Sequence, residues 1–171
     1  TDMDYIGDPA NHTGLYAFDE IDALNMVTFP GVTTAPVFHA AIAYCEGRQD
    51  CMLVAECPVA IEPLEAVDFR KGQGGPPSGA VCGCYARSDE KTHVWYAPAG
   101  IDRGRIFNVL GLGYKTSRGE RDVLYPEGIN VIASFPDSGI NIWGQKTLQS
   151  QPSATDRVNV RRLMMYMEEA I

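Results

Sequence analysis

The amino-acid sequence predicts an α/β (α+β) fold, in which helices pack on a mixed β-sheet. Three stretches of the chain carry this prediction. Residues 24–57 contain a strand, a helix and a second strand, which together form a βαβ unit. Residues 130–143 contain two strands joined by a tight turn, and residues 158–171 contain a helix with one apolar face.

The two strands of the βαβ unit are expected at residues 24–29 and 51–57. Before them, residues 1–23 have the composition of loop and turn, with a short helix expected over residues 16–23. The first strand ends at Pro30. The second is almost continuously apolar, which is typical of a strand that is covered on both faces. A right-handed crossover should connect the two.

The helix between these strands should begin after Thr34. A threonine hydroxyl can cap the first turn, and Pro36 lies where a missing N–H costs nothing. Gly47 should end the helix. One apolar stripe is expected to face the core, and it consists of Val37, Phe38, Ala41, Ile42 and Cys45.

The middle of the chain carries weaker signals. Residues 72–77, which contain three glycines and two prolines, have the composition of a linker. Ser78 should cap a helix over residues 79–87. Residues 93–96 are expected to be extended and residues 98–104 to form a loop. The pattern of residues 106–112 fits a strand and a helix equally well, so that both remain open.

The predicted hairpin consists of residues 130–135, a turn and residues 140–143. Pro136 fixes its backbone φ angle and Gly139 accepts a positive one, so the four residues between the strands favour a tight turn. Alternation in the second strand places Ile140 and Ile142 on one face and Asn141 and Trp143 on the other.

The last helix should bury an apolar face made of Val160, Leu163, Met164, Met167 and Ile171. Arg161, Arg162, Glu168 and Glu169 lie off that face. The two glutamates stand where a helix C-terminus would disfavour negative charge, and neither a glycine cap nor a proline follows them. We therefore expect the helix to continue beyond Ile171 in a longer parent protein, of which this chain is an internal fragment.

Composition narrows the classes of function. The 171 residues carry a formal net charge of −8, from 14 basic and 22 acidic side chains. This charge argues against a nucleic-acid-binding surface. The sequence holds no apolar run of the roughly 18 residues that span a bilayer. Five cysteines form an odd set without secretory context, which indicates reduced thiols rather than a disulfide framework.

The cysteines also raise the question of a metal site. Cys82 and Cys84 could join Cys45, Cys51 and Cys57 in a tetrahedral zinc site, but the spacing lacks the paired C-x₂₋₄-C pattern of such sites. Buried free cysteine is a common core residue. We expect no metal ion and no cofactor.

A cysteine hydrolase is the alternative function. Cys57 lies at the carboxyl end of a predicted parallel strand, where α/β enzymes place their sites, with Glu56 beside it. His39 or His93 would have to serve as the base. Acidic neighbours raise a thiol's pKa, and neither histidine comes with a recognisable orienting partner. We favour a non-catalytic role for Cys57 and for both histidines.

A phosphate-binding loop is the third candidate. Residues 111–119 contain a G-x-G pair and a Lys-Thr pair. They lack the third glycine of a dinucleotide fingerprint and the G-x-x-x-x-G-K-[ST] pattern of a P-loop. We interpret this segment as a loop without a nucleotide.

Four segments, in order, resemble the contractile tail sheath proteins of bacteriophages and related injection machines. Residues 76–89 are similar to the family's Pro-Pro-Ser-Gly helix, which ends in Tyr-Ala-Arg-Thr-Asp. Residues 94–100 resemble its Val-Trp-x-Ala-Pro-Ala-Asn. Residues 128–148 resemble its Gly-Ile-Asn hairpin, which ends in Trp-Gly-Ala-Arg-Thr-Leu. Residues 158–163 match its Ile-Asn-Val-Arg-Arg-Leu helix start. The resemblance divides the chain into an upstream portion, residues 1–75, and a truncated core segment, residues 76–171.

The resemblance implies a structural role rather than catalysis. Sheath subunits form six-membered rings that stack around a tail tube, and their contraction drives the tube through a host envelope. The implied partners are copies of the chain, the tube protein, and baseplate and terminator proteins, with neither nucleic acid nor membrane insertion. The implied location is the virion tail, assembled in the bacterial cytoplasm.

The resemblance also suggests contacts between subunits. Lys146, Arg161 and Arg162 are the candidates, because their charges could pair with acids of a neighbouring copy. The chain has Gln145-Lys146 where the family has Ala-Arg. A bidentate hydrogen bond that the arginine guanidinium makes in relatives would therefore be altered here. Residues 61–75 lack the family's aromatic Tyr-x-Pro-Trp segment, and its C-terminal portion would lie beyond Ile171.

Overall fold

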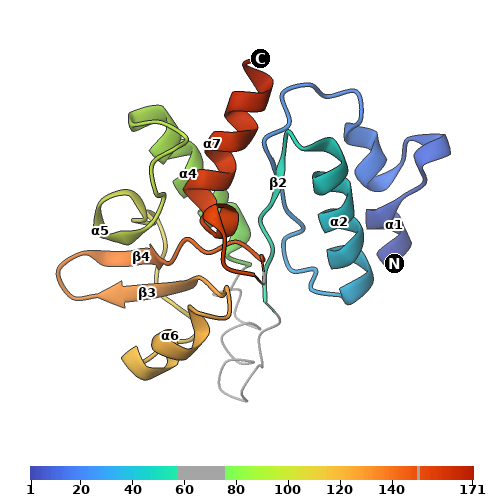
Figure 1. Ribbon diagram of the computed structural model, residues 1–171. Coiled ribbons are helices and arrows are strands. Elements are labelled where there is room, and N and C mark those ends of the chain that lie inside the picture. The colour runs from blue at the N-terminus through green and yellow to red at the C-terminus, as the bar shows by residue number, and fades with distance from the viewer. Residues whose placement is uncertain (58–75, 150) are drawn as a thin grey trace. The chain divides into compact units, whose positions relative to one another are not determined.

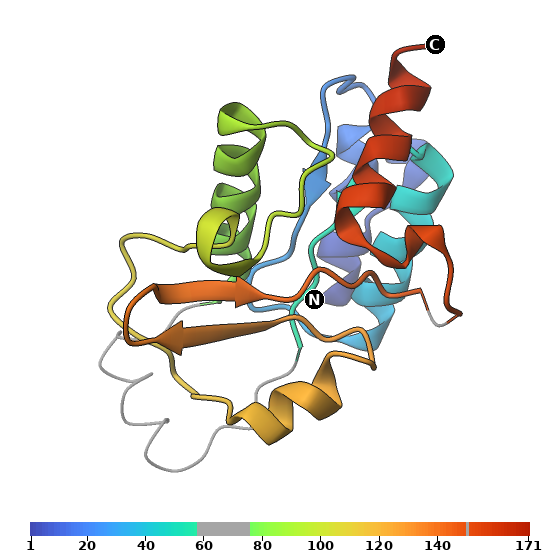
Figure 2. The ribbon, with the colours of Figure 1, turned by 60° about the vertical axis from the view of Figure 1, so that its left-hand side comes forward.

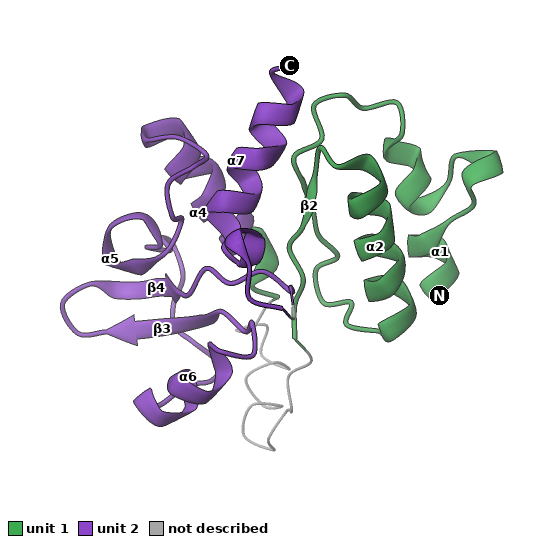
Figure 3. Ribbon diagram, viewed as in Figure 1, with its two compact units in different colours: residues 1–79 green, residues 80–171 purple. Residues whose placement is uncertain are grey.

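A computed structural model of the chain describes residues 1–57, 76–149 and 151–171 (Figure 1). The chain forms two compact units, Thr1–Gly79 and Ala80–Ile171 (Figure 3). Each combines helices with short strands, so the predicted mixed α and β fold is confirmed. Residues 72–75 of the predicted linker lie outside the described residues.

The first unit contains the predicted βαβ arrangement. Strands β1 (Met26–Val27) and β2 (Met52–Leu53) pair in parallel, and helix α2 (Ala35–Arg48) connects them. The ladder continues on each side of the short strands through backbone bonds of 3.0 Å and 2.8 Å. The unit begins with three short helical segments, which are α1 (Asp2–Ile6), η1 (Pro9–Asn11) and η2 (Gly14–Phe18).

Helix α2 supplies much of this unit's core. It starts after Thr34 with Pro36 in its first turn, as predicted, but it runs through Gly47. Gln49 ends it instead, because that residue adopts the left-handed conformation with φ of 67° and donates its N–H to Cys45 O. One side of the helix packs into a cluster made of Leu15, Val27, Ala41, Tyr44, Cys45 and Cys51.

The second unit is built around the predicted hairpin. Strands β3 (Val131–Phe135) and β4 (Gly139–Trp143) pair antiparallel, with Phe135 opposite Gly139. On the other edge of β4, residues 104–106 form two further backbone bonds of 2.7 Å and 2.8 Å. The hairpin lies between α4 (Ser78–Lys91) on one side and α6 (Arg118–Leu124) on the other (Figure 2).

Several predictions for the second unit were wrong in detail. Helix α4 continues four residues past its predicted end, and its first N–H group bonds to the carboxylate of Glu56 at 2.9 Å. Residues 93–96 form a turn, and the predicted loop at 98–104 contains helix α5 (Gly100–Arg103). Beyond the bridge at Arg105, residues 106–112 are neither helix nor strand.

Helix α6 went unpredicted although its signal is present. Ser117 and Glu120 form a capping box, in which each side chain accepts a hydrogen bond from the backbone N–H of the other. The helix has only seven residues and little apolar periodicity, so the cap is its main sequence signature.

The final helix, α7 (Val158–Glu169), follows the short segment η3 (Ala154–Asp156) and buries a different face from the predicted one. Val158, Arg162 and Met165 are its buried residues. From the predicted apolar face, Met164, Met167 and Ile171 are exposed and Val160 and Leu163 are half-buried. The helix is rotated because a charged residue, Arg162, finds a partner inside the unit.

Both faces of the second hairpin strand bury a side chain. Ile142 and Asn141 are both buried, although they point to opposite faces. The amide of Asn141 donates to the carbonyl oxygens of Ser138 and Gly139, at 3.2 Å and 2.9 Å. The hairpin's own turn therefore satisfies the NH₂ group of this buried amide, while its carbonyl oxygen accepts no hydrogen bond from a described residue.

Candidate functional site

Arg162, a predicted contact residue, lies inside the second unit. Its guanidinium forms two hydrogen bonds with the carboxylate of Asp89 on α4, one of them 2.9 Å long. The residue is only 7% exposed, and its guanidinium carbon lies 5.6 Å from the centre of the Tyr85 ring. Burial raises the pKa of Tyr85 to about 12, so this ring stays neutral. The group connects α4 to α7.

Lys146 also has an internal partner. Its ammonium lies 2.6 Å from a carboxylate oxygen of Asp156, whose other oxygen is 3.2 Å from Arg157. The hydrogen bond from Lys146 holds the pKa of Asp156 below its usual value. The backbone of Lys146 pairs with the Asn130 side chain through bonds of 2.8 Å and 2.7 Å.

Arg161 differs from these two residues. It lies half-buried on α7, and it forms no ion pair with any residue that the structure describes. The three predicted contact residues therefore do not converge on one point. Two are paired within their own unit, and Arg161 has no ion-pair partner among the described residues.

The residues of the alternative cysteine site do not form a catalytic group in the described structure. Cys57 and His39 are both exposed, and no hydrogen bond joins them. His93 instead stacks on Trp95, with ring centres 4.3 Å apart. Glu56 uses its two oxygens to accept the backbone N–H groups of Gly31 and Ser78.

The other thiols are buried or half-buried within their units. Cys45 and Cys51 belong to the core of the first unit, and burial raises the pKa of both Cys82 and Cys84. Within the described ranges, no group of three or more potential metal-ligating side chains comes together. None of the helices described there has the length and apolar character to cross a membrane.

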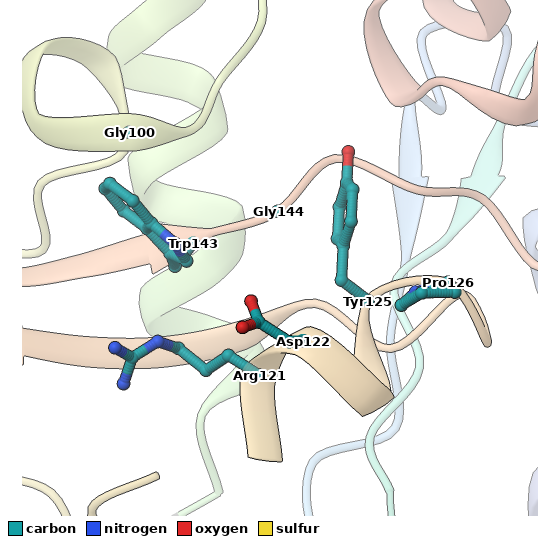
Figure 4. A pocket seen from close by; sticks show the side chains of 7 residues that line it. All are labelled: Gly100, Arg121, Asp122, Tyr125, Pro126, Trp143 and Gly144. Atoms are coloured by element: carbon teal, nitrogen blue, oxygen red, sulfur yellow. The ribbon is translucent and has the colours of Figure 1, made fainter. Parts of the chain in front are cut away.

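A pocket of about 360 Å³ opens on the second unit, between α6 and the end of β4 (Figure 4). Sequence reasoning missed it, because its residues are far apart along the chain. The Trp143 side chain, on a residue that is 40% exposed, forms one wall and Tyr125 forms the other. Asp122 lies between them. The lining consists of Gly100, Arg121, Asp122, Tyr125, Pro126, Trp143 and Gly144.

Comparison with known proteins gives a consistent answer. A family model described as the phage tail sheath protein central domain matches residues 1–148. The tail sheath protein of Enterobacteria phage T4 is 40% identical over 96 residues, which are 56% of this chain and 15% of that protein. The tail sheath protein of Vibrio phage KVP40 is 41% identical over 96 residues, with 56% and 14% covered.

Solved structures show the same fold at lower identity. The sheath complex of an extracellular contractile injection system, in its contracted state, has a TM-score of 0.73 at 18% identity, with 92% of this chain covered. The contracted helical sheath of the anti-feeding prophage has a TM-score of 0.64 at 23% identity, with 95% covered. The chain spans 50% of each of those two sheath chains.

Proposed function

The chain belongs to the phage tail sheath family, and from this premise we propose that it is part of a subunit that polymerises around a tail tube and contracts. The observation that carries the proposal is the family match over residues 1–148. The chain spans 15% and 14% of the length of the two curated relatives, and the activity of the whole sheath is part of this proposal.

The internal contacts of the second unit support a building block rather than a catalyst. A sheath subunit must keep its shape while its contacts with neighbours change. The Arg162–Asp89 pair connects two helices across 73 residues of sequence, and the Lys146–Asp156 pair closes the segment between β4 and α7, which favours such a rigid body. We infer that the chain has no enzymatic activity.

The proposed partners are those of a contractile tail. They are copies of the chain arranged in six-membered rings, the tube protein, and the baseplate and terminator proteins. Two of the similar structures come from a helical sheath and from a baseplate of the anti-feeding prophage, which agrees with self-assembly and with a baseplate contact. The proposed location is the virion tail, after assembly in the host cytoplasm.

Among the three predicted contact residues, Arg161 is the one that we propose for a contact between copies. Its charge has no ion-pair partner among the described residues. A neighbour's acid would have to compete with Asp156 for Lys146 and with Asp89 for Arg162. Displacing Asp89 would leave a buried charge without its partner, which is costly.

Electron microscopy of the purified full-length protein tests the proposal. We expect regular tubes or stacked rings, formed without added enzyme or cofactor. Dispersed single molecules at every concentration would contradict it. Alkylation of the native protein is a second readout, because fast and selective labelling of Cys57 near neutral pH would instead support the cysteine hydrolase.

A further inference from the structure

An exposed apolar loop protrudes from the second unit. We use this name for residues 107–110, in which Phe107, Val109 and Leu110 are all exposed. Leu110 is 99% exposed, so its side chain contacts almost nothing in its own chain. Asn108 adopts a left-handed backbone with φ of 59°, which gives the loop a sharp turn. Neighbouring exposed apolar side chains of this kind mark interaction sites.

The base of this loop is held firmly. Ile106 is buried, and its N–H donates to the carbonyl oxygen of Ile140 on β4 at 2.8 Å. The Phe107 ring has the guanidinium carbons of Arg87 and Arg105 at 4.4 Å and 5.0 Å from its centre. Neither arginine forms an ion pair with a described residue. The loop therefore presents an apolar tip on a positively charged base.

The pocket between α6 and β4 combines two aromatic walls with one carboxylate, and Arg157 bonds the hydroxyl of its Tyr125 wall. Its Trp143 wall is supported by the Phe135 ring, whose centre lies 4.6 Å away. Asp122 lies between the two aromatic walls, and its ion pair with Arg118 is 3.8 Å long between highly exposed side chains. An exposed ion pair of this kind contributes little to stability, so Asp122 can exchange Arg118 for another cation at little cost.

Arg121 also lines this pocket, but its charge is directed elsewhere. Its guanidinium donates to the carbonyl oxygen of Thr116 at 2.5 Å and lies 5.7 Å from the centre of the Phe135 ring. Figure 4 shows it pointing away from Asp122 and Tyr125. The centre of the pocket is therefore aromatic, with a carboxylate between its walls.

We propose that the exposed apolar loop of one copy docks in this pocket of a second copy, with Leu110 between the aromatic walls and Arg105 paired with Asp122. The proposal rests on the self-assembly proposed above. Charge complementarity selects the occupant, because the loop's base is positive and the pocket holds a carboxylate. The loop and the pocket are different surfaces, so the contact is head-to-tail. Such contacts build rings or helical arrays rather than closed pairs.

A charge exchange in the full-length protein tests the pairing. Arg105→Glu and Asp122→Arg should each raise the critical concentration for assembly at least about tenfold, because each places like charges together. The double variant should return the critical concentration most of the way to that of the unchanged protein. Lys91→Glu is the control matched to Arg105→Glu. It makes the same charge change at another exposed position and should leave assembly unchanged.

Photo-cross-linking tests the contact directly. With benzoylphenylalanine at position 110 and a mixture of isotope-labelled and unlabelled copies, we expect cross-links between copies to peptides that contain Tyr125 or Trp143. The same group at Ile21, exposed in the first unit, should not reach those peptides.

Each outcome has a defined meaning. Cross-links within one copy, or double variants no better than the single ones, would overturn the docking proposal. If the unchanged protein assembles and all the charge variants assemble equally well, this contact is wrong while the proposed sheath function stands. If the unchanged protein never assembles, the sheath function itself fails and the docking proposal fails with it.

Discussion

The guanidinium of Arg162 occupies a buried position on α7 that an apolar side chain would ordinarily fill. It is tolerated because Asp89 accepts two hydrogen bonds from it and the Tyr85 ring covers it. Apolar periodicity alone assigned the buried face to Met164 and Met167. Asp89 lies 73 residues earlier in the chain, so no local pattern could reveal the pairing.

Breaking this pair should be costly. We expect Asp89→Ala to lower the free energy of unfolding by about 3 kcal/mol, because the buried guanidinium loses its partner. Urea denaturation followed by circular dichroism measures the change. Arg161→Ala, on the same helix and without an ion pair in the described chain, should change it by no more than about 0.5 kcal/mol. Equal effects of the two substitutions would refute this role of Arg162.

The stability of the folded protein should depend on pH through Asp156. Its pKa is lowered in the folded state by Lys146, so its contribution is complete above the unfolded pKa of about 4 and is lost as pH falls through the folded value. Lys146→Ala should therefore destabilise the protein at pH 7, and the gap to the unchanged protein should close as pH falls below about 4. A constant gap would argue against this coupling.

At the scale of secondary structure, the hairpin and the βαβ unit followed from local chemistry. Turn residues and strand formers placed β3 and β4, and a hydroxyl with an early proline placed the start of α2. The start of α6 was signalled by Ser117 and Glu120. The pocket and the internal ion pairs could not be predicted, because they join side chains that only tertiary packing brings together.

Gly139 provides a test of the hairpin's geometry. Its φ of 72° is unfavourable for a residue with a Cβ atom, so Gly139→Ala should lower the free energy of unfolding by about 1 kcal/mol. Gly83 is the matched control in the same unit: it lies within α4, and a Cβ there would meet nothing. Gly83→Ala should raise stability by about 0.5–1 kcal/mol. Thermal unfolding of both variants would check the signs, and stabilisation by Gly139→Ala would contradict the turn geometry.

At the scale of the whole molecule, the proposed function depends on contacts between copies of the chain. The resemblance of four short segments predicted this role, and the family match over residues 1–148 confirms membership. Composition and charge served only to argue against a nucleic-acid-binding surface, a membrane span and a disulfide framework. Of the three basic residues predicted for contacts, Arg161 alone remains without an ion pair in the described structure, so it carries the prediction at this scale.

Arg161→Glu separates assembly from folding. The substitution should leave the free energy of unfolding within about 0.5 kcal/mol, because no described ion pair is lost. In the full-length protein it should reduce the yield of tubes, as quantified by pelleting and electron microscopy. Normal extended and contracted sheaths from this variant would remove Arg161 from the interface.

Cryo-electron microscopy of sheaths in the extended and the contracted state would show whether the second unit moves as a rigid body. We predict that residues 80–171 superpose in the two states with the Arg162–Asp89 pair intact, while the contacts between neighbouring copies are exchanged. A unit that rearranges internally, with this pair broken in one state, would show that the second unit is not the rigid body of a sheath.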